Sequence, residues 1–446
     1  MNGLSWLGIV RLGVVQMSLG AIVVLTTSTL NRVMVVELGM LAVLPGILVA
    51  VHYFIQIMRP RFGHGSDMGG RRTPWIIGGM AVLAVGGVGA AVATMVMATN
   101  AIAGIGLATL AFILIGAGVG ASGTSLLVLL AAEVSPARRA PAATITWVMM
   151  IFGFALTAGV AGAWLDPFSM PRLIAVTSVI SIIALGATIL AVRGIERCDG
   201  TRAKHESQPI QNEAPQAGFT DAVREVMSEP QTRRFGLFVF ISMLAYSAQD
   251  LVLEPFAGAV FGLTPGQSTQ LGGMQHGGVL VGMIAVAIIG NRFPRALRQC
   301  MITGCLISAI LLTCLALAGQ LGGNWPLQAN VFALGIANGV FAVAAIGSMM
   351  HLVSHGRSGR DGVRMGVWGA AQAIAFGLGG IAGTLAIDVI RWLTGEVTVA
   401  YSLVFAIQAS LFIAASILAA QLSNKRGTGA QATTGHTRSR LETADL

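Results

Sequence analysis

Long runs of apolar residues alternate with short polar or basic segments along the whole chain. Each of these runs is roughly 20 residues long or longer, which is the length that an α-helix needs to cross a ~30 Å hydrocarbon layer. The pattern therefore predicts twelve transmembrane helices. We place them at residues 9–30, 38–58, 74–98, 101–132, 141–163, 172–193, 235–258, 268–290, 298–318, 326–350, 362–387 and 398–421.

Composition supports an all-α, polytopic membrane protein. The 446 residues are 55% hydrophobic and only 10% charged, and the mean hydropathy is +0.78. Such values exclude an ordinary soluble domain. The four cysteines, at positions 198, 300, 305 and 314, lack the spacing of a zinc site, and no other cluster suggests a bound metal ion.

The net charge of +9 could indicate a nucleic-acid partner, but the positions of the basic residues argue against it. If the N-terminus is cytoplasmic, every Lys and Arg except Arg32, Arg172 and Arg391 lies at the cytoplasmic end of a span or in a cytoplasmic loop. This is the distribution that the positive-inside rule requires. We therefore expect both termini in the cytoplasm, a membrane-lipid environment and no nucleic-acid partner.

One long polar segment divides the twelve spans into six and six. It covers residues 194–234 and combines a linker of disordered type with a short amphipathic helix on the cytoplasmic surface. The expected domains are an N-terminal six-helix bundle at 1–193, this linker, a C-terminal six-helix bundle at 235–421 and a disordered cytoplasmic tail at 422–446.

The two halves also show an internal repeat. Adding 221 to a residue number in the first half places Arg71 on Arg292 and Trp147 on Trp368, and the start of "GVAGAWLD" falls on the start of the similar stretch "GIAGTLAID". Two six-helix units in the same orientation are the plan of the major-facilitator transporters, in which the ligand site lies between the halves near the membrane midplane. The sequence thus predicts two pseudo-symmetric bundles of this fold.

The loop after the second predicted span reads "GHGSDMGGRRTP". It resembles the signature loop of the major facilitator superfamily, in which glycines permit a tight turn and the charged groups pair across helix ends. The alternative is a basic cytoplasmic loop with turn glycines. The residues that carry the resemblance are Gly63, Asp67, Gly70, Arg71 and Arg72.

Two carboxylates interrupt the seventh predicted span. Asp250 and Glu254 are four residues apart, so they share one face of a helix. A charge in the middle of a span costs about 2.5–3.5 kcal/mol, and such residues usually face a cavity or a partner. We expect an inter-half polar site in which Arg32, beside Asn31, pairs with Glu37, Asp250 or Glu254. The alternative is a salt bridge at the outer rim.

These two stretches resemble a known family. "TLNRVMVVEL" in the first span and "AYSAQDLVLEPFAG" in the seventh are similar to the hallmarks of the PucC-type, or bacteriochlorophyll delivery, branch of the major facilitator superfamily. The resemblance covers about residues 5 to 420. One branch of this family carries the name of a bacteriochlorophyll synthase chain. The motif positions are Asn31, Arg32, Glu37, Gln249, Asp250, Glu254 and Pro255.

The resemblance implies a role in handling pigment. Family members assist the assembly of light-harvesting antenna complexes in purple photosynthetic bacteria, so the expected partners are bacteriochlorophyll or a precursor, as cargo, and antenna polypeptides. The expected location is the bacterial inner membrane, either cytoplasmic or intracytoplasmic. Candidate axial ligands for the pigment magnesium are His52, Gln275 and His276.

Three functions remain open at this point. The first is a pigment-binding factor for antenna assembly, and the second is a proton-coupled transporter of another lipophilic solute. The third is a prenyltransferase-type synthase subunit, which requires two acidic clusters to hold a diphosphate through Mg²⁺. Asp250 and Glu254 alone do not supply them. We therefore expect that the protein is not an enzyme.

Overall fold

The computed structural model describes residues 4–59, 71–135, 138–196, 228–292, 296–322, 325–354 and 361–422. All regular elements in these ranges are helices, as the all-α prediction requires. The first half contains α1 (Trp6–Val24), η1 (Leu25–Thr29), α2 (Leu30–Arg32), η2 (Val33–Glu37), α3 (Val43–Ile55), η3 (Gln56–Met58), α5 (Thr73–Met97), α6 (Ala101–Glu133), α7 (Arg139–Leu165) and α8 (Met170–Val192). The second half contains α10 (Pro230–Phe261), α11 (Pro265–Arg292), α12 (Ala296–Leu321), α13 (Leu327–Ser354), α14 (Asp361–Thr394) and α15 (Val397–Ala420).

The helices match the predicted spans. Within the described ranges, 11 helical stretches are long and apolar enough to cross a membrane, and the second predicted span is the shorter apolar helix Val43–Met58. The largest difference in the first half concerns the first span, which continues to Glu37 instead of ending near residue 30. The helix does not end at Asn31 and Arg32, because both side chains find hydrogen-bond partners in the second half, and the chain continues through two π-helical turns.

Several helix ends follow directly from the sequence. Ser5, Asn100 and Ser169 precede α1, α6 and α8, and each side chain accepts a hydrogen bond from the backbone N–H three residues later. This satisfies a donor that the first turn of a helix leaves free. Gly262 ends α10 in the left-handed conformation, with φ of +67°, which glycine adopts without strain.

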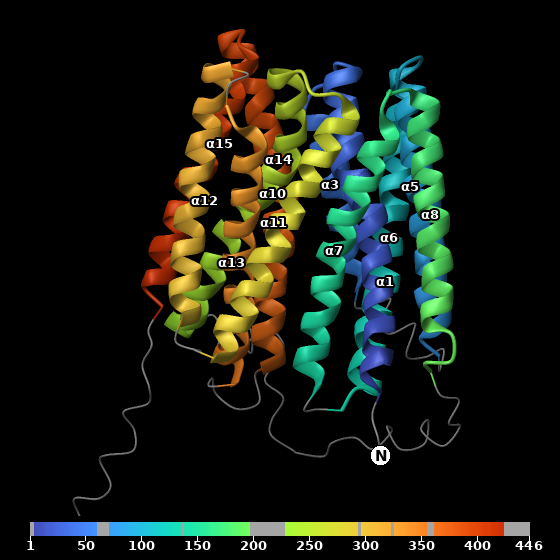
Figure 1. Ribbon diagram of the computed structural model, residues 1–446, viewed down its shortest axis with the longest axis vertical. Coiled ribbons are helices and arrows are strands. Elements are labelled where there is room, and N and C mark those ends of the chain that lie inside the picture. The colour runs from blue at the N-terminus through green and yellow to red at the C-terminus, as the bar shows by residue number, and fades with distance from the viewer. Residues whose placement is uncertain are drawn as a thin grey trace, which may run out of the picture.

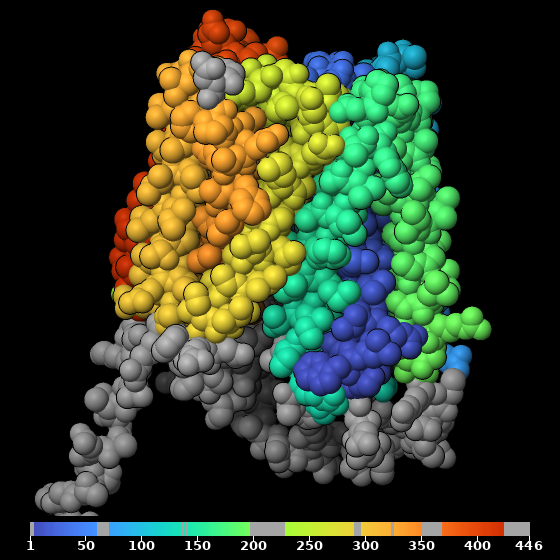
Figure 2. All heavy atoms as spheres, in the orientation of Figure 1, coloured from blue at the N-terminus to red at the C-terminus, as the bar shows by residue number. Residues whose placement is uncertain are grey.

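Apolar side chains form one main core in each half. Ile9 and Phe112 belong to the first core, and Phe238 and Phe412 belong to the second. The halves meet where α3 packs on α14 and where α7 packs on α11. Figure 1 shows α7 and α11 as neighbours, and Figure 2 shows their side chains in contact along this interface. Leu251 of α10 packs into the first core, and α10 contacts α2, so the two halves also interlock there.

The helices of the bundle run between two opposite ends. Figure 1 places the N-terminus at the bottom, and we call this the terminal end. The opposite end, where α10 turns into α11 around Gly262, is the distal end. The predicted topology would make the terminal end cytoplasmic.

The repeat holds for helix positions but not for every side chain. Each helix of the second half begins within six residues of the position obtained by adding 221 to the start of its counterpart in the first half. The counterparts of α10, α11, α12, α13, α14 and α15 are α1, α3, α5, α6, α7 and α8. Trp147, however, is 40% exposed, whereas Trp368 is buried and donates a hydrogen bond to the carbonyl of Thr232. Residues 197–227 and 423–446 lie outside the described ranges, and with them the expected amphipathic helix and nearly all of the tail.

Candidate functional site

The end of the first span has an unusual backbone. Two π-helical turns, η1 and η2, flank the three-residue α2, and the segment Leu25–Met34 is buried. π-Helical turns contain an extra residue per turn and occur frequently at functional sites. Here the widened turns contact α10 and α11 of the second half. The "TLNR" motif therefore lies between the two halves.

Asn31 completes the backbone of α10. Pro255 lies inside α10 and has no N–H, so the carbonyl of Leu251, four residues earlier, loses its helical donor. The side-chain amide of Asn31 donates a 2.6 Å hydrogen bond to this carbonyl. A proline in a membrane helix is tolerated when a neighbouring group satisfies the freed carbonyl. Asn31 and Pro255, two motif residues 224 positions apart in sequence, thus form one structural unit.

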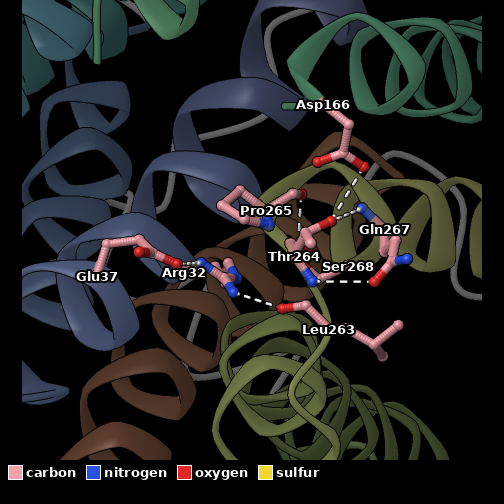
Figure 3. Close-up of polar contacts among 8 residues, drawn as sticks. All are labelled: Arg32, Glu37, Asp166, Leu263, Thr264, Pro265, Gln267 and Ser268. Atoms are coloured by element: carbon pink, nitrogen blue, oxygen red, sulfur yellow. Dashed lines mark hydrogen bonds and ion pairs between the residues drawn. The ribbon is translucent and has the colours of Figure 1, made fainter. Parts of the chain in front are cut away.

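Arg32 is the buried cation of the site. Its Nη1 donates to Glu37 Oε1 at 2.5 Å, and its Nη2 donates to the carbonyl of Leu263 at 2.6 Å, just beyond the end of α10 (Figure 3). The negative end of the α10 dipole also favours a cation here. The guanidinium lies against Gly258, where an added Cβ would come within 2.9 Å of Nη2.

Glu254 lies close to this contact and is equally buried. Ser28 of η1 donates a 2.5 Å hydrogen bond to Glu254 Oε1, while Oε2 has no partner among the described residues. Nearby, the hydroxyls of Thr29 and Thr269 are 3.1 Å apart. Gly272 of α11 leaves the space that the carboxylate occupies, because a Cβ there would lie 2.4 Å from Oε1. Glu254 is therefore held between both halves of the protein.

Asp250 occupies a different environment, one helical turn toward the terminal end. It is only half-buried and makes no hydrogen bond to another residue of the described ranges. Tyr53 of α3 and Tyr246 of α10 lie close enough to interact with its charge. Phe376 of α14 contacts both tyrosine rings, at centroid distances of 5.3 and 6.0 Å. An acidic group thus meets an aromatic cluster contributed by both halves.

The structure brings only some of the predicted polar residues together. Arg32 pairs with Glu37, whose side chain is 35% exposed, and not with Asp250 or Glu254. Gln249 faces the interior of the second bundle, where its Oε1 accepts from Asn338. Asn338 in turn accepts from Ser308. Gln249 therefore stabilises the C-terminal bundle and lies apart from the contacts between the halves.

The candidate pigment ligands differ in their hydrogen bonding. His52 is buried in α3, and its Nε2 is 2.9 Å from the side-chain amide of Gln56. His276 is buried in α11 against Phe154 of α7, with ring centroids 5.0 Å apart, and has no hydrogen bond within the described ranges. Gln275 is buried, and its Nε2 likewise lacks a partner there.

No group of three or more His, Cys, Asp or Glu side chains in the described residues is placed to hold a metal ion. A pigment ligand differs from such a site, because one axial nitrogen or oxygen is sufficient. His276 meets this requirement more simply than His52, since neither of its ring nitrogens is hydrogen-bonded to a described residue.

The signature loop is described only at its end. Gly63, Asp67 and Gly70 lie outside the described residues, whereas Arg71 and Arg72 lead into α5. The carboxylate of Glu196, which follows α8, accepts hydrogen bonds from the N–H groups of Arg72 at 2.7 Å and Thr73 at 3.0 Å. Partial burial raises the pKa of Glu196, but these hydrogen bonds outweigh it and leave the pKa below its usual value.

Two acidic residues of the distal end were not predicted from the sequence. Asp388 of α14 accepts hydrogen bonds from the N–H groups of Ala42, at 2.9 Å, and Val43, at 2.8 Å, and so caps α3 from the other half. Asp166, at the end of α7, accepts from the hydroxyl of Thr264 at 3.0 Å (Figure 3). The position of Asp166 at the end of a span was an available signal, whereas Asp388 lies inside α14 and had none.

Comparison with solved structures shows the fold. The chain is similar to crystal structures of the nucleoside transporter NupG, with a TM-score of 0.66 and 14% identity, and of a D-xylose–proton symporter, with a TM-score of 0.67 and 16% identity. Each alignment covers 93% of this chain, together with 99% of NupG and 97% of the symporter. The predicted major-facilitator fold is confirmed. At this level of identity, the likeness concerns the fold alone.

Comparison with known sequences shows the family. The chain is 51% identical over 426 residues to the bacteriochlorophyll synthase 44.5 kDa chain of Rhodobacter capsulatus, covering 95% of this chain and 97% of that protein. It is 30% identical to protein PucC of the same organism, covering 94% of this chain and 93% of PucC. The family model of the PUCC protein matches residues 29–427, which include both motifs. The chain belongs to the PUCC protein family.

Proposed function

We propose that this membrane protein binds bacteriochlorophyll or a precursor inside the bilayer and delivers it to light-harvesting antenna polypeptides as the complexes assemble. Membership of the PUCC family and the name of the R. capsulatus relative support a link to this pigment. The observation that carries the proposal is His276, a buried imidazole within the membrane with no hydrogen bond to a described residue.

The surroundings of His276 suit an apolar macrocycle. A neutral imidazole provides a lone pair that can bind an axially open metal. His276 lies at the interface of α7 and α11, where Ile151, Phe154, Val279 and Met283 form an apolar cluster. Burial in such a place favours the neutral form of an imidazole over its charged form. A pigment ring would therefore meet an uncharged ligand and apolar walls.

The proposed role is that of a carrier and not of an enzyme. One relative is named as a chain of bacteriochlorophyll synthase, but we assign no chemical step to any residue of this protein. We place the protein in the inner or intracytoplasmic photosynthetic membrane, with its terminal end in the cytoplasm. The antenna polypeptides are the proposed recipients.

The test is pigment binding by purified protein. The protein is purified in mild detergent from a pigment-producing host, and bound pigment is measured by absorption and by extraction. We expect near-stoichiometric pigment in the wild type and at least a tenfold loss in His276→Ala. His52→Ala is the matched control, because its Nε2 already interacts with Gln56, and it should retain pigment. A colourless wild type, or equal retention by both variants, would contradict the proposal.

A second function is favoured by Asp250. An unpartnered, half-buried carboxylate between the halves could take up a proton during transport of another lipophilic solute. This alternative predicts solute flux in sealed vesicles that stops when the proton gradient is dissipated and that is lost in Asp250→Asn. Pigment binding that survives this substitution, without such flux, would favour the carrier.

A further inference from the structure

We propose that the two halves stay joined at the distal end throughout the working cycle, so that cargo enters and leaves only from the terminal side or from the bilayer. This distal seam is defined by Asn31, Arg32, Glu254 and Asp388 with their partners in the opposite half. The protein would then never release its cargo at the distal face of the membrane. The test by pigment binding and antenna absorption rests on the proposed function, whereas the test by thiol labelling does not.

Each half supplies hydrogen-bond partners to backbone groups of the other half. Asn31 supplies a donor to the carbonyl of Leu251, and Arg32 supplies one to the carbonyl of Leu263. In the other direction, Asp388 supplies acceptors to the first N–H groups of α3. The carbonyl of Leu251 has no helical donor because of Pro255, and the groups at the ends of helices have no partner within their own helix. Opening the seam would leave all of them unpaired at once.

The contact between Asn31 and Leu251 lies deep below the distal end of the bundle. Leu251 lies ten residues before the end of α10 at Phe261, which is about 15 Å along the helix at 1.5 Å per residue. Water would have to penetrate this far to replace the amide of Asn31. Arg32 and Glu254 are buried beside this position, and each would need rehydration as well. An open distal end therefore requires a deep aqueous vestibule and not a small local movement.

The helices of the two halves also pack closely at the distal seam. An added Cβ on Gly46 of α3 would come within 2.2 Å of the hydroxyl of Thr384 in α14, and one on Gly258 would meet Arg32. The helices therefore approach each other at contact distance near the polar groups. The described contacts nearer the terminal end include ring pairs, such as Tyr53 with Phe376 and Phe154 with His276. Ring contacts have weaker directional requirements than buried hydrogen bonds, so this region can separate more easily.

A disulfide lock tests the proposal. Thr29 and Thr269 lie on opposite sides of the seam with their hydroxyl oxygens 3.1 Å apart, so a cysteine pair there is within reach of a disulfide. Thr29→Cys and Thr269→Cys are combined in a chain whose four native cysteines are replaced, with a protease site inserted within residues 197–227. Oxidation with copper phenanthroline should keep the cleaved halves together on a non-reducing gel. The single-cysteine variants are the controls.

The expected result is that the oxidised double variant binds pigment and restores antenna absorption in a deletion strain to within twofold of its reduced form. Loss of activity on oxidation, with recovery on reduction, would overturn the proposal. Failure of the disulfide to form would also overturn it, because a permanent seam holds the two sulfur atoms in range. A wild type without pigment or antenna activity would instead contradict the proposed function.

Thiol labelling tests the seam without any functional assay. In the cysteine-free chain, Thr29→Cys should not react with a membrane-impermeant maleimide, with or without pigment present. Leu41→Cys, at an exposed position near the same distal end, is the matched control and should react fully. Labelling of Thr29→Cys at a rate within tenfold of Leu41→Cys would show that the seam opens.

Discussion

The side-chain amide of Asn31 donates a hydrogen bond to the carbonyl of Leu251, which Pro255 leaves without its helical donor. A residue of the first span thus supplies the hydrogen bond that the backbone of the seventh span lacks. This relationship explains why a polar residue and a proline occur at these positions in two separate motifs. It also explains a buried asparagine without invoking a ligand.

The Asn31 contact predicts a coupled pair of substitutions. Asn31→Ala should destabilise the protein by about 1 kcal/mol, because a buried carbonyl loses its partner. Pro255→Ala restores the helical N–H, so Asn31→Ala should cost little in that background. Thermal unfolding in detergent of the two single variants and the double variant measures the coupling. Additive effects would show that Asn31 does not serve this carbonyl.

Gly258 is predicted to be intolerant of even a methyl group. In Gly258→Ala the new Cβ would displace the guanidinium of Arg32 and weaken its bond to Leu263, so the melting temperature should fall by several degrees. Gly277→Ala in α11 is the control, since a Cβ there meets no atom within 4 Å. It should be neutral or slightly stabilising, because alanine favours helix more than glycine does. Equal melting temperatures would contradict the close contact.

Arg32 and Glu37 should behave as one unit. Arg32→Ala should be strongly destabilising, by roughly 3 kcal/mol, because it removes the donor to Leu263 and leaves Glu37 unpaired. Adding Glu37→Ala to Arg32→Ala should then cost less than Glu37→Ala costs alone. Arg32→Ala with Asp250→Ala should instead be additive, since no ion pair joins these two residues in the described ranges. Chemical unfolding of the variants distinguishes the two pairings.

Glu196 gives a pH-dependent prediction. Its pKa is lowered from the usual value of 4.5 by hydrogen bonds from the N–H groups that begin α5, so its contribution to stability is fully present above about pH 4.5 and is lost as the pH falls through the lowered value. Glu196→Gln should therefore lower the stability by about 1 kcal/mol at pH 7 and by less near pH 3. Glu396→Gln, which precedes α15 without a side-chain cap, is the control. A difference from wild type that does not change with pH would contradict this account.

The sequence predicted the helices well because a transmembrane span is specified locally. Length and apolarity placed α5 within one residue of its observed ends, Thr73 and Met97. The π-helical turns were not predicted, since no pattern in residues 25–29 distinguishes a π-helical turn from an α-helical one. Their geometry depends on docking to α10 and α11, which is a tertiary effect.

The partners of polar residues were harder to predict. Arg32 had three candidate carboxylates, and its ion-pair partner is Glu37, five residues later in the same span. The placement of the halves decides only that neither Asp250 nor Glu254 of α10 forms an ion pair with it in the described ranges. The role of Asn31 could have been anticipated, because a proline inside a span always frees a carbonyl four residues earlier. Asp388 lacked such a signal, since nothing in its own span indicates that it caps α3.

The pairing of Arg32 with Glu37 also bears on how the chain enters the membrane. Leu263, the other acceptor of Arg32, follows it by 231 residues and is synthesised only after the whole first half. Glu37 follows Arg32 by five residues and leaves the ribosome almost with it. The two side chains can therefore partition from the translocon as a neutral dipole, which reduces the insertion penalty of about 2.5–3.5 kcal/mol for a lone arginine. Glu37 thus provides the counter-ion of Arg32 during insertion, before α10 has been synthesised.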